Sequence, residues 1–411
     1  MCGRRASAPE LAEASWLAPE VKGRIHRAHP SWVAASGACA GCVQRALLTE
    51  LLERPEGTPA HTCVLPTPLH MRADPRYAGR GVTLALVDSG FHPHPDLTLP
   101  HNRICAWADA GVEPVRAEFY TAGETPVWPA SDAGAPAQWH GLMTSAIAAG
   151  NGWLSHGLYR GLAGEADLIL VQVREPRGRI TNQGIARALR WLGEVGPGLG
   201  LRVVNLSVGG DPMEPGASDP VDEAVSSLVS AGVTVVAAAG NDGQRRLVPP
   251  ASSPAALTVG GLDDKNAFDP VEMELWHSSY GPSSSGAGKP ELVAPSIWVV
   301  APLLPGTSKA AEAKALFEAR AAGDAAAEAG LEAMKFITPH YHHVDGTSVA
   351  APLVAGVAAC LLEADPTLTP ERLREILMAA SRPVPGAPAE RQGAGALDAG
   401  RAAALVAPRP L

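Results

Sequence analysis

The chain is organised around one stretch, Val344-Asp345-Gly346-Thr347-Ser348-Val349-Ala350-Ala351-Pro352, which leads directly into the apolar segment 353–362. This apolar run ends at Glu363, so it is too short to span a bilayer and predicts a buried core helix. Pro352 is expected in the first helical turn, where its missing N–H costs nothing. A serine at the start of such a helix lies near backbone N–H donors that favour negative charge. Ser348 therefore suits a nucleophile whose attack produces an oxyanion, although a serine before a helix is more often a simple N-cap.

Five apolar runs precede this stretch and alternate with helical patterns. Parallel strands covered on both faces are nearly continuous in apolar residues. The runs are 82–87, 168–173, 203–208, 233–239 and 257–260. Helical patterns follow His140, Thr181 and Asp219, and the last two are good N-cap residues. The alternation predicts an α/β fold, a doubly wound and mostly parallel sheet with helices on both faces.

Four polar side chains stand where strands end or helices begin. Asp88 ends the first strand, His140 is expected to open a helix, Asn241 follows the fourth strand, and Ser348 opens the core helix. In an open parallel sheet, ligands bind at the carboxyl ends of the strands. Acyl transfer requires a nucleophile, a base, a carboxylate that orients the base, and donors for the oxyanion. The chain order Asp, His, Ser matches one of the few orders found in known triads.

From about Gly81 to Ala404 the chain resembles the subtilisin-like serine proteases, or subtilases. Three motifs carry most of the resemblance, and the serine motif is the most specific of them. They are the aspartate motif in 81–90 with His94-Pro95-Asp96-Leu97, the histidine motif His140-Gly141, and the serine motif 346–352. Three further segments, 204–210, 238–241 and 393–398, are similar to the family's substrate-binding strand, its oxyanion asparagine stretch and its closing Gly-x-Gly segment.

The resemblance implies a role for each polar side chain. Ser348 would attack the scissile carbonyl, and His140 would act first as general base and then as general acid. Asp88 would stay ionised and orient the imidazole. The side-chain N–H of Asn241 and the backbone N–H of Ser348 would donate to the oxyanion. The chain is thus expected to be a serine endopeptidase that forms an acyl-enzyme and requires no cofactor for catalysis.

The expected substrate is a protein or peptide in extended conformation. Ser207, Val208 and Gly209 would pair with its backbone, and the alternative for these three residues is an ordinary strand end. A different class of function also remains open, a catalytically silent scaffold that binds a peptide without cutting it. A protease dedicated to the maturation of one partner would differ from the main hypothesis only in specificity.

The first 77 residues form a separate appendage in this interpretation. Cys39-Ala40-Gly41-Cys42 precedes an amphipathic helix, and Cys63 lies beyond that helix. Two cysteines two residues apart can share one tetrahedral zinc ion, so we expect either a structural zinc site at Cys39, Cys42 and Cys63 or free thiols. The appendage could inhibit the enzyme, recognise a partner or bind zinc.

Residues 78–406 form the expected peptidase domain, and 407–411 a frayed tail. An Ala/Glu-rich insert, 308–336, precedes the serine motif and predicts helices broken near Gly323, as either a surface hairpin or a lid or docking element. His340, His342 and His343 follow it. We expect these histidines to be solvated in a loop, with metal binding or tuning of the site as the alternative. The resemblance transfers no calcium site, because no matching ligand run is present.

The charge of the chain indicates which classes of partner to expect, and its cysteine content indicates the cellular compartment. The net charge is -9 with no block of Lys or Arg, which argues against nucleic acid and anionic membranes as partners. Six cysteines favour a reducing compartment over a disulfide scaffold. No apolar signal segment is seen near the N-terminus, so the expected location is cytoplasmic.

Overall fold

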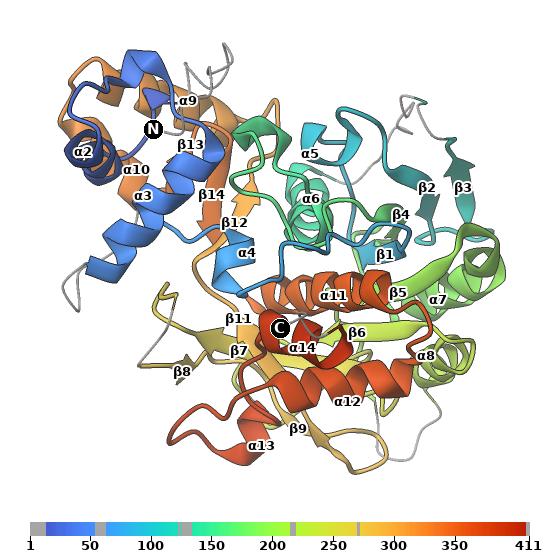
Figure 1. Ribbon diagram of the computed structural model, residues 1–411. Coiled ribbons are helices and arrows are strands. Elements are labelled where there is room, and N and C mark those ends of the chain that lie inside the picture. Colours follow the sequence, from blue (N-terminus) through green and yellow to red (C-terminus); the bar gives the residue numbers. More distant parts are fainter. Residues whose placement is uncertain are drawn as a thin grey trace.

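The computed structural model describes residues 14–53, 63–121, 124, 134–213, 219–268 and 272–407 (Figure 1). The strands are β1 (Thr83–Asp88), β2 (Ile104–Asp109), β3 (Arg116–Phe119), β4 (Asp167–Gln172), β5 (Leu201–Leu206), β6 (Thr234–Ala238), β7 (Leu257–Asp263), β8 (Glu274–Leu275), β9 (Gly281–Pro282), β10 (Gly288–Lys289), β11 (Leu292–Pro295), β12 (Val299–Pro302), β13 (Phe336–Thr338) and β14 (Tyr341–Val344). The helices are α2 (Pro19–Ala28), α3 (Ala40–Glu53), α4 (Thr67–His70), α5 (Pro95–Thr98), α6 (Ala135–Ala149), α7 (Asn182–Val195), α8 (Pro220–Ser230), α9 (Ser308–Ala321), α10 (Ala326–Ala333), α11 (Thr347–Ala364), α12 (Pro370–Ala380), α13 (Ala389–Gln392) and α14 (Ala399–Val406). Apart from Ala407, the predicted frayed tail lies outside the described residues.

The central sheet confirms the predicted α/β architecture. Its strand order is β11-β7-β6-β5-β1-β4-β2-β3, with β8 paired to β7. The pairs from β11 through β2 are parallel, whereas β3 and β8 join antiparallel. Each of the five apolar runs predicted from the sequence forms a strand of this sheet. Because these strands are parallel, the ends of β1, β5 and β6 lie at the same edge.

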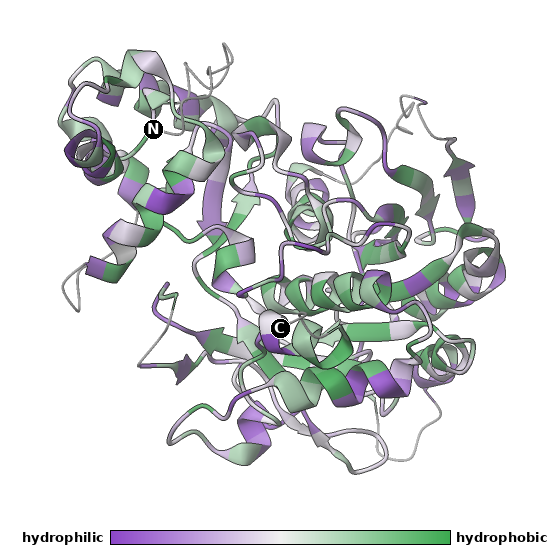
Figure 2. Cartoon of the chain, viewed as in Figure 1, coloured by the Kyte–Doolittle hydropathy of each residue, from purple (hydrophilic) through white to green (hydrophobic). Residues whose placement is uncertain are grey.

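Helices cover both faces of the sheet, and alternate residues of each strand divide between two cores. Leu84 and Leu86 pack in the core that holds α6 and α11, whereas Ala85 and Val87 pack in the core that holds α7 and α8. This is the two-residue alternation of a strand, here apolar on both sides. Figure 2 shows apolar residues concentrated along the central strands and along α11.

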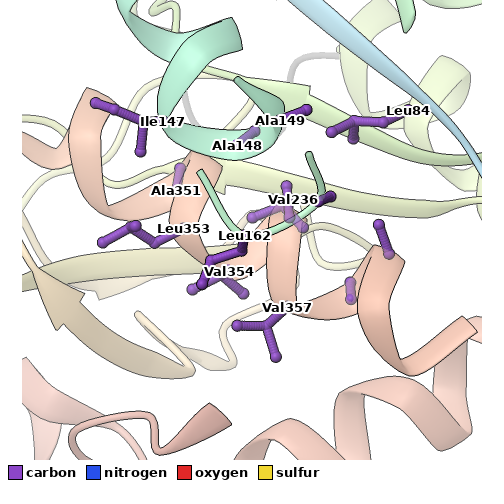
Figure 3. Packing of buried hydrophobic residues seen from close by; sticks show 14 of the residues in the cluster. Leu84, Ile147, Ala148, Ala149, Leu162, Val236, Ala351, Leu353, Val354 and Val357 are labelled. Carbon is purple, nitrogen blue, oxygen red and sulfur yellow. The ribbon is translucent and has the colours of Figure 1, made fainter. Parts of the chain in front are cut away.

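α11 is the central helix of one core and packs against both α6 and the sheet. In Figure 3, Ala351, Leu353, Val354 and Val357 of α11 lie beside the end of α6 and beside Val236 of β6. By length and composition, α11 is the one helix within the described residues that could cross a membrane, but 78% of that apolar window is buried inside the protein. It is therefore the core helix that the sequence predicted.

A second, smaller sheet lies beside the first, with strand order β12-β14-β13. The predicted insert forms α9 and α10, which end before and begin after Gly323, as expected. α2 and α3 of the N-terminal segment share a buried cluster with Val300, Ile337 and Tyr341 of this small sheet. The appendage and the insert are therefore both packed onto the small sheet, whose strand β14 leads into α11.

Candidate active site

Asp88 and His140 form a close pair at the carboxyl edge of the sheet. Asp88 ends β1, is fully buried, and lies with its Oδ1 2.6 Å from Nδ1 of His140. Thr144 donates its hydroxyl to the other carboxylate oxygen at 2.9 Å, and the backbone N–H of Ser89 donates to Oδ1 at 2.6 Å. A carboxylate bound in this way holds Nδ1 of the imidazole as the donor and leaves Nε2 free to act as a base.

The sequence placed His140 at the start of its helix, and this prediction is wrong. α6 begins five residues earlier at Ala135, so His140 and Thr144 are one turn apart on the same face. That spacing lets one helix hold both oxygens of Asp88. Gly141 permits the approach, because a Cβ at this position would lie 1.9 Å from the carbonyl oxygen of Gly90.

Asn241 is oriented by the residue that precedes the candidate nucleophile. Its side-chain oxygen accepts the backbone N–H of Thr347 at 2.9 Å and the Thr347 hydroxyl at 2.7 Å. The same hydroxyl accepts the backbone N–H of Gly240 at 3.0 Å. These bonds assign the amide oxygen to Thr347 and leave Nδ2 as the exposed donor. Gly346 lies beneath this donor with φ 131°, a conformation that favours glycine.

Ser348 is half-buried at the second position of α11, and Gly346 is the N-cap. Pro352 therefore lies inside the helix, not in its first turn as the sequence suggested. Because Pro352 has no N–H, the carbonyl oxygen of Ser348 loses its usual partner four residues ahead. The hydroxyl of Ser207 donates to that oxygen instead, at 3.3 Å. The end of β5 is thus tied to the backbone of the candidate nucleophile.

The electrostatics of His140 fit the role of a base. Burial lowers its pKa, but the charge of Asp88 and the hydrogen bond to it outweigh burial, so the pKa of His140 is raised above its ordinary value of 6.5. The side chain keeps 31% of its surface exposed, so the ring remains accessible from the edge of the sheet.

The predicted substrate segment continues β5 beyond its last paired residue. Ser207 and Val208 are buried, whereas Gly209 is exposed at the same edge as Asp88. Asn205 donates its side-chain amide to the Ser207 hydroxyl at 3.0 Å, which fixes the start of the segment.

The histidines that follow the insert are not solvated, so that expectation is wrong. His342 and His343 lie on β14 and are each 3% exposed. His340 lies at the turn between β13 and β14 and is half-buried. These histidines are buried because β14 pairs with both β12 and β13. The sequence does not indicate this pairing, because β14 is short and contains polar residues.

The structure gives the positions of the three cysteines that were predicted as zinc ligands. Cys39 and Cys42 lie at the start of α3 with their sulfur atoms 3.5 Å apart, and Cys63 is fully buried in the same cluster of side chains as α2 and α3. Within the described ranges, no three His, Cys, Asp or Glu side chains gather as a metal site. His61, which lies two residues before Cys63 in the sequence, is outside those ranges.

Comparison with known proteins agrees with the resemblance seen in the sequence. A model of the subtilase family matches residues 79–395. Serine protease AprX of Bacillus subtilis (strain 168) is 32% identical over 307 residues, which are 73% of this chain and 61% of AprX. Subtilisin BL of Lederbergia lenta is 29% identical over 73% of this chain and 82% of its own length.

Among solved structures, a protease from Pseudoalteromonas arctica superposes with a TM-score of 0.57 at 23% identity, over 84% of this chain and 94% of that one. The fold is therefore shared with this protease even where few residues are identical. The chain spans about three fifths of AprX, so it matches a part of that relative and not its whole length. With the family match covering the sheet, the Asp88–His140 pair and the Ser348 helix, the chain belongs to the subtilase family.

Proposed function

We propose that the protein is a serine endopeptidase that cleaves extended peptide segments through an acyl-enzyme. The observation that carries this proposal is the buried Asp88 held 2.6 Å from Nδ1 of His140, at the sheet edge where Ser348 lies in the first turn of α11. Ser348 attacks the scissile carbonyl, His140 takes its proton from the hydroxyl and returns it to the leaving amine, and Asp88 stabilises the imidazolium. The relatives named above are themselves described as proteases or subtilisins.

The oxyanion is stabilised by two N–H groups in this proposal. Nδ2 of Asn241 and the backbone N–H of Ser348 donate to the oxygen that becomes negative. The first turn of α11 adds the positive end of the helix dipole. Because Thr347 holds the amide oxygen of Asn241, the donor is fixed before the substrate arrives, and no reorganisation is needed during the reaction.

The substrate is proposed to lie along Ser207, Val208 and Gly209 as an added strand. This mode uses backbone hydrogen bonds for affinity, so it accepts many sequences. An intracellular location and a regulatory or processing role remain predictions from the sequence alone.

A fluorophosphonate probe tests the proposed nucleophile. The probe forms a covalent bond only with an activated serine, so the wild-type protein should be labelled and Ser348→Ala should not be. Folding of the variant is checked by circular dichroism. A folded wild-type protein that takes up no label and cleaves nothing in a mixed peptide library would instead support the silent peptide-binding scaffold.

Replacement of Asn241 by Ala should lower kcat by about 100- to 1,000-fold with little change in KM, because the lost donor acts mainly in the transition state. Thr347→Val should lower kcat by a smaller factor, because it removes the hydroxyl that orients Asn241 but leaves the amide in place. Thr347→Ser, which keeps that hydroxyl, is the matched control and should stay near the wild-type rate. Equal kcat values for Asn241→Ala and wild type would refute the oxyanion assignment.

The raised pKa of His140 predicts where activity is lost in acid. A general base must be neutral, so kcat/KM should fall as the pH drops through a midpoint above 6.5, the ordinary value for histidine. The neutral form is restored as the pH rises, so this limb of the profile ends in a plateau on its alkaline side. A profile of kcat/KM against pH measures the midpoint, and a flat profile between about pH 5 and 8 would contradict a histidine base.

We also propose that Cys39 and Cys42 supply two ligands of a structural zinc site, as their 3.5 Å separation allows. Within the described residues Cys63 does not gather with this pair, so Cys63 and a histidine would complete the tetrahedral set only if zinc binding brought them to it. The purified protein should then contain about one zinc ion per chain by elemental analysis, and Cys42→Ser should lower that content. A wild-type zinc content near zero would leave the pair as free thiols.

A further inference from the structure

The small sheet β12-β14-β13 lies next to the segments that carry the proposed base, His140, and the proposed nucleophile, Ser348. On one side, β14 runs directly into the nucleophile loop, because only Asp345, Gly346 and Thr347 separate its last residue from Ser348. On the other side, it contacts Trp139, the residue immediately before His140. One sheet is thus connected both to the helix of the base and to the loop of the nucleophile.

Trp139 is half-buried and is fixed to this sheet by two contacts. Its indole Nε1 donates to the carbonyl oxygen of Pro302 on β12 at 3.2 Å. Its ring lies tilted against the imidazole of His342 on β14, with 5.4 Å between ring centroids and 53° between ring planes. Because Trp139 precedes His140 in α6, these contacts act on the turn of helix that carries the base.

His342 is in turn fixed by the insert. Nζ of Lys309, on α9, donates to Nδ1 of His342 at 3.2 Å. Nδ1 is therefore the acceptor, and the proton of the neutral ring is on Nε2. That Nε2 is buried and has no hydrogen-bond partner within the described residues. The Lys309 ammonium also lies 5.9 Å from the ring centre of Trp139, a cation–π distance.

This arrangement of His342 costs folding free energy, which is consistent with a role for the position of its ring. A buried ring N–H without an acceptor is unfavourable, and an aliphatic side chain would fill the same space without that loss. Burial, with Lys309 next in effect, lowers the pKa of His342 to about 3, so the ring stays neutral throughout the range in which His140 titrates. His342 therefore offers shape and a tilted aromatic contact, and no proton for the reaction.

We propose that His342 is a positioning residue for the peptidase reaction: held by Lys309, it braces Trp139 and so sets the distance between His140 and Ser348. The inference rests on the proposed function of those two residues and names the element that aligns them. A shift of about 1 Å between reacting groups can cost on the order of 100-fold in rate, so a brace of this kind affects turnover strongly.

The next residue along β14 provides a matched control. His343 is also a histidine and is also 3% exposed, but neighbouring residues of a strand point to opposite faces. Its ring stacks on Trp298 at 4.9 Å, away from Trp139. His342→Ala and His343→Ala therefore remove the same side chain from the same strand, at the same burial, and only the first removes the contact with Trp139.

The experiment compares His342→Ala, His342→Phe and His343→Ala with the wild-type protein. We expect His342→Ala to lower kcat, and the rate of fluorophosphonate labelling, by about 10- to 100-fold with KM nearly unchanged. His342→Phe keeps an aromatic ring against Trp139 and should recover most of that rate. His343→Ala should retain the wild-type kcat to within about threefold, even if both Ala variants lower the melting temperature equally. The acid limb of the pH profile should not move in any of them.

Two results would overturn the proposal. The first is a loss of kcat in His343→Ala equal to that in His342→Ala, which would show a general effect of destabilising β14. The second is an acid limb displaced in His342→Phe, which would show that the imidazole takes part in proton transfer. Failure of the proposed function looks different, because it would appear as wild-type protein that is not labelled at Ser348.

Discussion

The site depends on the burial of α11 between α6 and the central sheet. The helix starts at Thr347, so its burial places the first turn against the ends of β5 and β6 while its middle packs along α6. Each fully buried leucine or valine of this helix contributes about 1.5–3 kcal/mol relative to exposure. The packing that stabilises the domain thus also brings together side chains that are far apart in sequence. No separate interaction is needed to assemble the site.

The buried polar groups of the candidate site have hydrogen-bond partners that compensate their burial. A buried carboxylate without partners costs several kcal/mol, and Asp88 avoids this cost through donors from Ser89, which follows β1, and from α6. Removal of one partner from such a pair typically costs about 3–5 kcal/mol, so the geometry of the pair is strongly constrained. The same logic explains Ser207. Its hydroxyl donates to the carbonyl oxygen of Ser348, which would otherwise accept the backbone N–H of a residue other than proline at position 352.

The positions of the candidate site residues were more predictable than the residues that support them. Asp88 and Asn241 stand in motifs at strand ends, and His140 and Ser348 stand in helical motifs, where short-range sequence decides the local structure. Thr144 was missed, although its spacing of four from His140 is a signal that one helical face carries both. The helix starts were misplaced because α6 and α11 begin in segments with weak caps, Gly134 and Gly346, neither of which makes a side-chain cap bond.

The long-range supports could not be predicted from the sequence, because they depend on strand pairing between distant segments. β14 contains two histidines and no alternation of apolar residues, so only its position between β12 and β13 makes it a buried strand. The same small sheet also packs against the N-terminal appendage. Val300, Ile337 and Tyr341 are buried against the appendage's helices, and Tyr341 also donates its hydroxyl to both carboxylate oxygens of Asp96. Removal of the appendage would expose apolar side chains on the strands that lead into the nucleophile loop. The appendage is therefore part of the structure that supports the candidate site.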